Sequence, residues 1–241
     1  MNLVIDIGNT LTKLAIFQDE EIVHKEVLED FTSDTLESIR NSFPGINKAI
    51  LSTVKNREPI LLQHLSQSFE YFLELDHTTP LPITNKYETP VTLGYDRLAA
   101  VVGANTIFPN SNVLIIDIGS AITFDFIDLE NNYQGGNISP GLNMRFRALH
   151  EFTSNLPLVQ PSGQDSGIGK NTTEAIRKGV QNGIVNEVNG FIDHMISEYK
   201  DLKIIVTGGD SNFFDNSLKN SIFVDLNLIL KGLNCILEHN A

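Results

Sequence analysis

The chain has 241 residues, of which 41% are hydrophobic and 20% charged, with a formal net charge of -13. A chain of this length buries roughly 70% of its unfolded surface, so we predict a well-packed globular protein. The acidic balance and the lack of a lysine or arginine block argue against a nucleic-acid face or a binding surface for anionic membranes. The single cysteine, Cys235, has no partner for an internal disulfide or a CxxC metal site, and we predict that it is a buried small residue.

No apolar stretch reaches the roughly 18 residues of a membrane span. The first residues also lack the basic segment and apolar core that are typical of a signal peptide. We therefore expect a cytoplasmic protein with no membrane partner.

Hydrophobic periodicity predicts alternating strands and helices, which is typical of an α/β protein with mixed sheets flanked by helices. In chain order, strands are expected at 2–7, 11–17, 22–28, 48–54, 70–75, 113–118, 122–128, 132–138 and 203–207. Helices are expected at 33–42, 57–68, 95–107, from the turn at 139–141 to 152, at 173–198 and at 226–238. Residues 76–90 contain three prolines and are expected to form an irregular loop with ligand contacts.

Two apolar stripes mark the last long helices as packed elements. The stripe of helix 173–198 comprises Ile176, Val180, Ile184, Val188, Phe191 and Met195, and that of helix 226–238 comprises Leu226, Ile229, Leu230, Leu233 and Leu237. Gly179, Gly183 and Gly190 weaken helix 173–198, which predicts close approach by another backbone, either the sheet or a second subunit. Arg145 and Arg147 on the preceding helix are interpreted as solvated rather than catalytic.

The most informative feature is a repeated segment: residues 4–10, VIDIGNT, return as residues 115–121, IIDIGSA. Each copy begins with an aliphatic run that is typical of a buried strand, and it ends in an aspartate, a glycine turn and a second strand. A glycine turn lets backbone amides approach phosphate oxygens, and the carboxylate can hold a hydrated cation beside them. One copy could equally be an ordinary turn. The matched pair predicts a two-lobed nucleotide cleft with a boundary near residue 110.

Three further segments carry polar residues that packing does not require. Asp96 stands in the first turn of helix 95–107, where the helix dipole keeps a carboxylate ionised; the alternative is a helix cap with an incidental Arg97. Residues 135–141 place glycines before a helix N-terminus, which suits an anion or hydroxyl group but also a plain connection. Residues 206–211 end a strand with two glycines, which would admit a flat ring against the backbone.

Together these segments resemble, in order and over nearly the whole chain, the type III pantothenate kinases of bacterial coenzyme A synthesis. The matching segments are DIGNT at 6–10 with Lys13, Tyr87 with LGYDR at 93–97, IDIGSAITFD at 116–125, GGNISPGL at 135–142, Thr153 with Leu156 and Pro157, GKNTTEAI at 169–176, and VTGG at 206–209. Ser120 stands where the family usually has threonine, and Tyr95 where alanine is common.

The resemblance implies a fold of duplicated actin-like (ribonuclease H-like) domains, with an ATP cleft between lobes 1–110 and 111–241. It implies ATP-dependent phosphorylation of pantothenate with Mg²⁺ and a monovalent cation, K⁺ or NH₄⁺. It also implies a homodimer with shared sites. The ATP and phosphate contacts that it assigns are Asp6, Ile7, Gly8, Asn9, Thr10, Leu11, Thr12, Lys13, Ser120, Gly208 and Gly209.

The same resemblance assigns roles to the other polar residues. Asp6 would carry Mg²⁺ on the ATP phosphates, Asp117 would bind the monovalent cation, and Asp96 would be the general base. The implied substrate contacts are Tyr87, Gly94, Tyr95, Asp96, Arg97 and Thr172, the last from the same or a neighbouring subunit.

Two other functions remain open at this point. The first is a different phosphotransferase or a polyphosphate phosphatase on the same fold, since fold alone does not assign function; Arg97 and Tyr87 beside Asp96 argue against it. The second is a regulatory relative that binds nucleotide without turnover. The joint presence of Asp6, Asp96 and Asp117 favours an enzyme.

Overall fold

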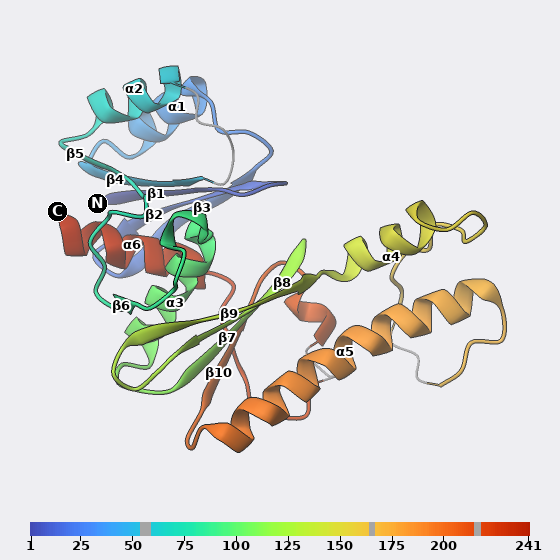
Figure 1. The fold of residues 1–241 in the computed structure, drawn as a ribbon. Helices are drawn as coiled ribbons and strands as arrows, with labels where there is room; N and C mark the ends of the chain where they lie inside the picture. Colours follow the sequence, from blue (N-terminus) through green and yellow to red (C-terminus); the bar gives the residue numbers. More distant parts are fainter. Residues whose placement is uncertain (54–58, 164–166, 215–217) are drawn as a thin grey trace. The chain divides into compact units, whose positions relative to one another are not determined.

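The computed structural model describes residues 1–53, 59–163, 167–214 and 218–241. The chain divides into two compact units, coloured along the sequence in Figure 1. The first unit contains Met1–Pro109, Asn131–Tyr133 and Asn227–Ala241, and the second contains Asn110–Glu130 and Gln134–Leu226. The C-terminal segment therefore packs with the N-terminal one, and three residues of the middle of the chain join them.

A five-stranded mixed sheet forms the centre of the first unit, in the order β3-β2-β1-β4-β5. Its strands are β1 (Asn2–Ile7), β2 (Thr12–Gln18), β3 (Glu21–Leu28), β4 (Lys48–Thr53) and β5 (Tyr71–Glu74). β1 is antiparallel to β2 but parallel to β4. Asp6 lies near the carboxyl end of β1, opposite Lys13 and Ser52 of the neighbouring strands.

Helices cover both faces of this sheet (Figure 1). One face packs on α1 (Ser33–Ser42) and α2 (Pro59–Ser68), and α1 begins with a capping box between Thr32 and Thr35. Leu3 and Ile5 of β1 belong to the apolar core on that side. The other face packs on α6 (Leu228–Asn240), which contacts β1, β2 and β4, and on α3 (Tyr95–Ile107).

The contact between α3 and α6 is unusually close because each helix presents a glycine to the other. A Cβ on Gly232 would overlap the carbonyl oxygen of Ala99, and one on Gly103 would lie 2.5 Å from the carbonyl oxygen of Leu228. The backbones of the two helices therefore touch directly. This contact fixes α3, whose first turn carries Asp96 and Arg97.

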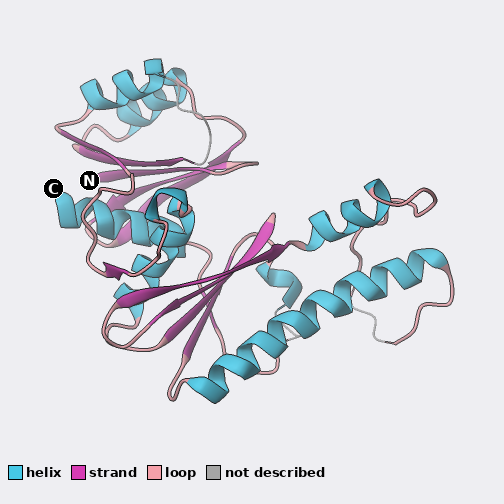
Figure 2. Cartoon of the chain, in the orientation of Figure 1, coloured by secondary structure: helices cyan, strands magenta, loops and turns pink. Residues whose placement is uncertain are grey.

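The second unit is built on the first five strands of a six-stranded mixed sheet with the order β11-β10-β7-β8-β9-β6, in which β6 (Thr84–Asn85) pairs with the start of β9. Its strands are β7 (Val113–Ile118), β8 (Ala121–Ile127), β9 (Asn132–Pro140), β10 (Lys203–Thr207) and β11 (Phe223–Val224). Its helices are α4 (Leu142–Glu151) and the long α5 (Thr172–Glu198), both visible in Figure 2. β7 and β8 form an antiparallel hairpin and β10 lies parallel to β7, which repeats the β1–β2–β4 arrangement of the first unit.

The predicted strands and long helices are present with small differences at their ends, and the short elements were missed. Those are β6 (Thr84–Asn85), the 3-10 turns Pro90–Thr92 and Ser211–Phe214, and β11. They contain two to four residues, too few for a periodic pattern. The predicted positions 54, 57 and 58 lie outside the described residues.

Several sequence expectations are corrected by the packing. On α5 the buried stripe contains Ile192, whereas Phe191 is only partly buried. On the last helix Leu226 precedes the first turn and is 49% exposed. Cys235 is half-buried and accepts a hydrogen bond from Thr106 Oγ1 at 3.5 Å, so it is not a core residue.

The glycines of α5 and the arginines of α4 also differ from expectation. A Cβ on Gly179, Gly183 or Gly190 would meet nothing within 4 Å, so the sheet of this chain does not approach them. Arg145 is not simply solvated: its Nη2 bonds Glu187 of α5 at 2.5 Å and Ser139 at 2.9 Å. Arg147 does lie on the surface, where it pairs with Glu151. Arg145 therefore joins the start of α4 to α5.

Candidate active site

The first glycine turn joins β1 to β2 as predicted. The amide of Gly8 donates to the carbonyl oxygen of Leu11 at 3.1 Å, and a Cβ on Gly8 would lie equally close to that oxygen. Asn9, Thr10 and Leu11 are exposed at the tip, and Ile7 is half-buried. The turn thus presents backbone and small side chains next to Asp6, which is the arrangement a phosphate group needs.

Asp6 is a buried carboxylate, with 7% of its surface exposed. Its pKa is raised to about 6, mainly by burial and then by the charge of Asp96, while Lys13 and the Ser52 hydroxyl oppose the shift. Asp6 and Asp96 are distant in sequence, yet α3 and β1 bring their charges close enough to interact. Two interacting carboxylates form a site where a divalent cation relieves repulsion.

The surroundings of Asp6 fit a bound nucleotide and metal. Thr12, also from the predicted phosphate motif, is 1% exposed and its Oγ1 has no hydrogen-bond partner in the part of the chain that the structure describes. A buried hydroxyl without a partner is costly, and a phosphate oxygen or a metal-bound water would satisfy it. The Asp6 carboxylate is an oxygen ligand of the kind that Mg²⁺ prefers, and the Lys13 ammonium group and the turn amides are suitable donors for a phosphate.

Asp96 is held at the start of α3 by local geometry. The cap residue of this helix is Gly94, and the Oδ1 of Asp96 accepts the amide of Arg97 at 2.8 Å. A Cβ on Gly94 would overlap that carboxylate oxygen, so a larger residue there would displace the Asp96 side chain from this position. Asp96 and Tyr95 are half-buried and remain accessible to a ligand.

Arg97 and Tyr87, which the family resemblance assigns to the substrate, lie in contact with each other. Arg97 is 5% exposed, and its guanidinium carbon lies 5.5 Å from the centre of the Tyr87 ring. Tyr87 itself is half-buried and follows the two-residue strand β6. A guanidinium over an aromatic face is a favourable cation–π contact.

Sequence reasoning missed two residues beside these groups, Ser52 and Tyr133. Ser52 is completely buried opposite Asp6 on β4. Tyr133 is completely buried and its ring stacks on that of Tyr87. Neither carries a motif signal, because both look like ordinary strand residues; only the strand pairing reveals their neighbours.

In the second unit three predicted segments converge. The amide of Gly119 donates to Ala121 at 3.0 Å, which forms the second turn, and Asp117 pairs with Thr207 across β7 and β10. Gly208, from the VTGG segment, has φ +98 and packs so tightly that a Cβ would overlap the Oδ1 of Asp117.

Gly141, from the glycine-rich segment, completes this group of residues. Its amide donates to the carbonyl oxygen of Ser120 at 3.2 Å, and a Cβ on it would overlap the carbonyl oxygen of Gly119. Ser120 itself and Gly209 are exposed. The second turn, the glycine-rich segment and VTGG therefore form one surface around Asp117.

Thr172 is the first residue of α5 and has an exposed side chain. The helix start beneath it is capped by Asn171, whose Oδ1 accepts the amide of Glu174 at 3.0 Å. Thr172 belongs to the second unit, whereas Tyr87, Asp96 and Arg97 belong to the first. Its role in substrate binding stays a prediction.

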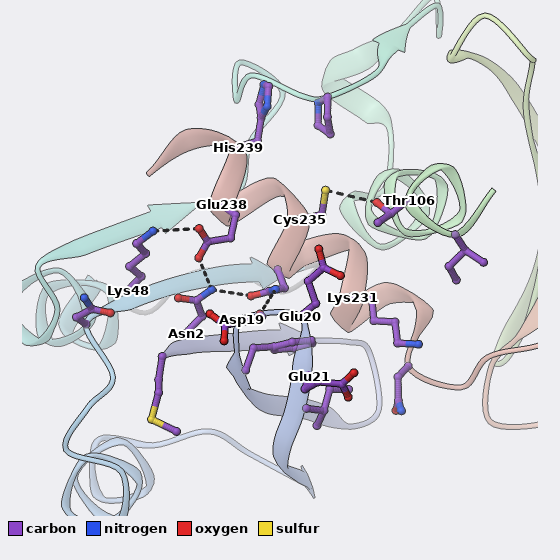
Figure 3. Close-up of a pocket in the computed structure, with 18 residues that line it drawn as sticks. Asn2, Asp19, Glu20, Glu21, Lys48, Thr106, Lys231, Cys235, Glu238 and His239 are labelled. Carbon is purple, nitrogen blue, oxygen red and sulfur yellow. Dashed lines mark hydrogen bonds and ion pairs between the residues drawn. The ribbon is translucent and has the colours of Figure 1, made fainter. Parts of the chain in front are cut away.

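A cavity of about 1150 Å³ in the first unit is drawn in Figure 3. Its lining includes Asn2 at the start of β1, whereas Asp6 lies near the other end of that strand. Its wall contains a polar network in which the side-chain Nδ2 of Asn2 donates to Asn234 Oδ1 at 2.8 Å and to Glu238 Oε1 at 2.6 Å. Lys48 pairs with Glu238 at 3.1 Å. No predicted site residue lines this cavity, and its polar network anchors α6 to the sheet.

The comparison with known families decides the assignment. The family model for type III pantothenate kinases matches residues 2–194. The chain belongs to the type III pantothenate kinase family. It is similar to a type III pantothenate kinase of Bacteroides fragilis (strain ATCC 25285), with 48% identity over 100% of this chain and 98% of the relative. It is also similar to a type III pantothenate kinase of Christiangramia forsetii, with 47% identity over 100% of this chain and 99% of that relative.

Solved structures confirm the predicted actin-like α/β fold. A Baf family protein from Campylobacter jejuni has a TM-score of 0.59 at 24% identity and covers 99% of this chain and 98% of its own. A glucokinase from an Antarctic psychrotroph has a TM-score of 0.54 at 10% identity, and the match covers 99% of this chain and 98% of the glucokinase. At these identities the likeness concerns the fold, and the family assignment rests on the sequence matches.

Proposed function

We propose that this chain transfers the γ-phosphoryl group of ATP in line to the primary hydroxyl of pantothenate, with Asp96 as the general base. Membership of the type III pantothenate kinase family supports the overall reaction, the ATP-dependent formation of 4'-phosphopantothenate in the first step of coenzyme A biosynthesis. The observation that carries the role of Asp96 is its place in the first turn of α3, beside Arg97 and close enough to Asp6 to raise that residue's pKa.

The residues around Asp6 would bind the phosphates of ATP. Residues 7–13 would wrap the phosphate tail, with the turn amides and Lys13 compensating its negative charge. Asp6 would hold Mg²⁺ directly or through water, and the ion would supply further charge compensation in the loose transition state. Ionised Asp6 is required for this, so binding is favoured above its raised pKa.

Asp96 would orient the attacking hydroxyl and accept its proton. A carboxylate is a weak base for an alcohol, but in a loose transition state the proton leaves late, so orientation matters more than basicity. The half-buried position of Asp96 leaves its side chain accessible to a substrate. Its Oδ1 is held by the amide of Arg97, which leaves Oδ2 for the hydroxyl.

The polar groups near Asp96 would bind the rest of pantothenate. Arg97 would pair with the substrate's carboxylate or amide, and Tyr87 would line the same pocket together with Gly94 and Tyr95. Thr172 would close on the substrate from the start of α5. The family resemblance supports these contacts, and the contact between Arg97 and Tyr87 agrees with them.

The second unit would contribute the remaining nucleotide contacts. Asp117 would bind the activating K⁺ or NH₄⁺, Ser120 would contact the phosphate tail, and Gly208 and Gly209 would lie against the adenosine. The close packing of Gly208 on Asp117 supports a shared site for these groups. In this proposal the two lobes, with a boundary near residue 110, are the halves of a duplicated kinase, and residues 227–241 pack with the first lobe.

The cytoplasmic location and the homodimer are further parts of the proposal. Use of ATP supports the location, and the family resemblance supports the dimer, with Thr172 acting in either subunit. None of the helices in the described ranges is long and apolar enough to cross a membrane. Light scattering of the purified chain would test the dimer: a monomer at assay concentrations would contradict it.

A coupled assay for ADP release tests the reaction directly. With Mg²⁺, K⁺ and ATP, we expect ADP release to depend on pantothenate and to be absent with glucose, acetate or water alone as acceptor. Mass spectrometry should find one phosphate added to pantothenate. ADP release that is independent of pantothenate, or that responds to another acceptor, would contradict the proposal.

A further inference from the structure

The segment that carries Tyr87 is weakly held by its own secondary structure. Tyr87 follows β6, a strand of only two residues, and the flanking positions 86, 88 and 89 are exposed. Its amide donates to the side chain of Asn85 at 2.9 Å, which shapes the local turn. A two-residue strand does not fix a side chain by itself, so the position of the Tyr87 ring depends on what packs against it.

The start of β9 supplies that support through both backbone and side chain. The amide of Lys86 donates to the carbonyl oxygen of Tyr133 at 3.0 Å, and Asn85 pairs with Tyr133 in the parallel β6–β9 ladder. The rings of Tyr87 and Tyr133 stack with 6.1 Å between their centres and 4° between their planes. Tyr133 is completely buried, so its ring is a fixed surface for the partly exposed one.

The Tyr87 ring in turn contacts Arg97. Arg97 lies in the first turn of α3, next to Asp96, and its guanidinium carbon is 5.5 Å from the centre of the Tyr87 ring. A misplaced Tyr87 ring would therefore remove one of the contacts that orient this buried arginine. The chain of contacts runs from Tyr133 through Tyr87 to Arg97.

We propose that Tyr133 is a positioning residue for pantothenate: its ring holds Tyr87 and, through it, Arg97 in the geometry that recognises the substrate. The inference rests on the proposed function, which assigns Tyr87 and Arg97 to the substrate. Tyr133 itself acts through Tyr87 and not by touching the reacting atoms. Its loss should therefore weaken pantothenate binding and leave the phosphoryl transfer step nearly intact.

Steady-state kinetics of matched variants test this split. We expect Tyr133→Leu to raise the KM for pantothenate roughly 10-fold, because one aromatic contact and the cation–π contact that it supports are lost. The kcat and the KM for ATP should stay within about 2-fold. Tyr133→Phe keeps the ring and should retain the wild-type KM. Tyr71→Leu on β5 is a control for removing a half-buried tyrosine elsewhere in the same unit.

A double-mutant cycle identifies the route of the effect. If Tyr133 acts through Tyr87, adding Tyr133→Leu to a Tyr87→Leu background should change the KM for pantothenate by less than about 2-fold. An unchanged KM in Tyr133→Leu, or full additivity with Tyr87→Leu, would overturn the inference. If the wild type shows no pantothenate-dependent turnover, it is the proposed function that fails.

A measurement on the wild-type chain covers the case in which Tyr133→Leu does not fold. The chain has five tyrosines, so ring-labelled tyrosine NMR gives few signals, and the variants Tyr133→Phe and Tyr87→Phe assign the two that matter. Titration with pantothenate in the presence of ADP and Mg²⁺ should shift the Tyr87 and Tyr133 ring signals together. A shift of Tyr87 with no change at Tyr133 would overturn the coupling.

Discussion

Asp6 is a buried carboxyl group, and the free-energy penalty of ionising it in the folded chain can be measured by changing this one residue. Its folded-state pKa of about 6 lies above the ordinary value of 3.8, so the folded chain binds this proton more tightly than the unfolded chain. The contribution of Asp6 to folding is therefore most favourable below pH 4 and is lost as the pH rises through 6. Ligand-free folding is thus penalised at neutral pH by the same carboxylate that the proposal gives to Mg²⁺.

We predict that Asp6→Asn stabilises the ligand-free chain at pH 8 by up to about 3 kcal/mol, since the shift spans about two pKa units. The difference should disappear below pH 4, where the wild-type carboxyl is protonated. Urea unfolding of the variant and the wild type at pH 8 and below pH 4 measures this difference in the free energy of unfolding. Asp30→Asn removes an exposed carboxylate and serves as the charge control. A variant that is less stable than the wild type at pH 8 would show that Asp6 is stabilised by partners rather than penalised by burial.

The two glycines of VTGG allow a sharp comparison between neighbours. Gly208 has φ +98 and no room for a Cβ beside Asp117, whereas a Cβ on Gly209 would meet nothing within 4 Å. We predict that Gly208→Ala destabilises the chain by about 1–3 kcal/mol and weakens nucleotide binding at least about 10-fold. Gly209→Ala should leave stability within about 0.5 kcal/mol. Thermal unfolding and calorimetric titration with ADP measure both; equal effects at the two positions would contradict this account.

Motifs in the sequence point to the candidate site residues but not to the residues that pack against them. The two glycine turns and Asp96 in a first helical turn were expected from local signals, whereas the grouping of Arg97 with Tyr87 came from the family resemblance. Tyr133 was not expected, because its importance comes from a parallel pairing with β6 that no local pattern encodes.

Among the elements, α3 and α6 carry the most restrictive contact. The carbonyl oxygen of Ala99 occupies the place that a Cβ on Gly232 would need. We predict that Gly232→Ala forces the helices apart and lowers the free energy of unfolding by about 1–3 kcal/mol. Gly179→Ala, on the open face of α5, should instead raise it by up to about 1 kcal/mol through helix propensity. Chemical denaturation of both variants gives the comparison, and a neutral Gly232→Ala would contradict the close packing.

Element boundaries followed from the sequence where apolar runs were long, and failed where tertiary pairing decides. The strand–turn–strand repeat was read correctly because each strand is a continuous aliphatic run, as in Val113–Ile118. β6 and β11 are too short to show a period, and they form only because β9 and β10 offer an edge to pair with. The sheet of this chain does not approach the glycines of α5, which the sequence did not show because helix periodicity does not reveal which face stays open; their packing against a second subunit stays a prediction.

For the molecule as a whole, the duplication was visible in the sequence. The packing of residues 131–133 and 227–241 with the first unit was not. The return of residues 227–241 to the first unit depends on contacts such as Asn2 with Asn234, which are remote in sequence. A resemblance to one family predicted the function because seven motifs occur in the family's order. The fold alone is shared with a glucokinase.

In the proposed function a monovalent cation activates the whole enzyme, and Asp117 is the residue through which this can be tested. We predict that replacing K⁺ by Na⁺ lowers pantothenate-dependent turnover at least about 10-fold, since Asp117 lacks an ion of suitable size and coordination. Asp117→Asn should make turnover low and insensitive to this exchange. Initial rates at constant ionic strength measure it. Equal rates in K⁺ and Na⁺ for the wild type would remove Asp117 from this role.

The most direct test of the central claim is the effect of Asp96→Asn on turnover and on nucleotide binding in the same preparation. We predict that pantothenate-dependent ADP release falls by at least about 10²-fold, as expected for loss of a general base. The affinity for ADP with Mg²⁺, measured by calorimetry, should stay within about 3-fold, since Asp96 does not contact the nucleotide in this account. Near-wild-type turnover in Asp96→Asn would contradict the account.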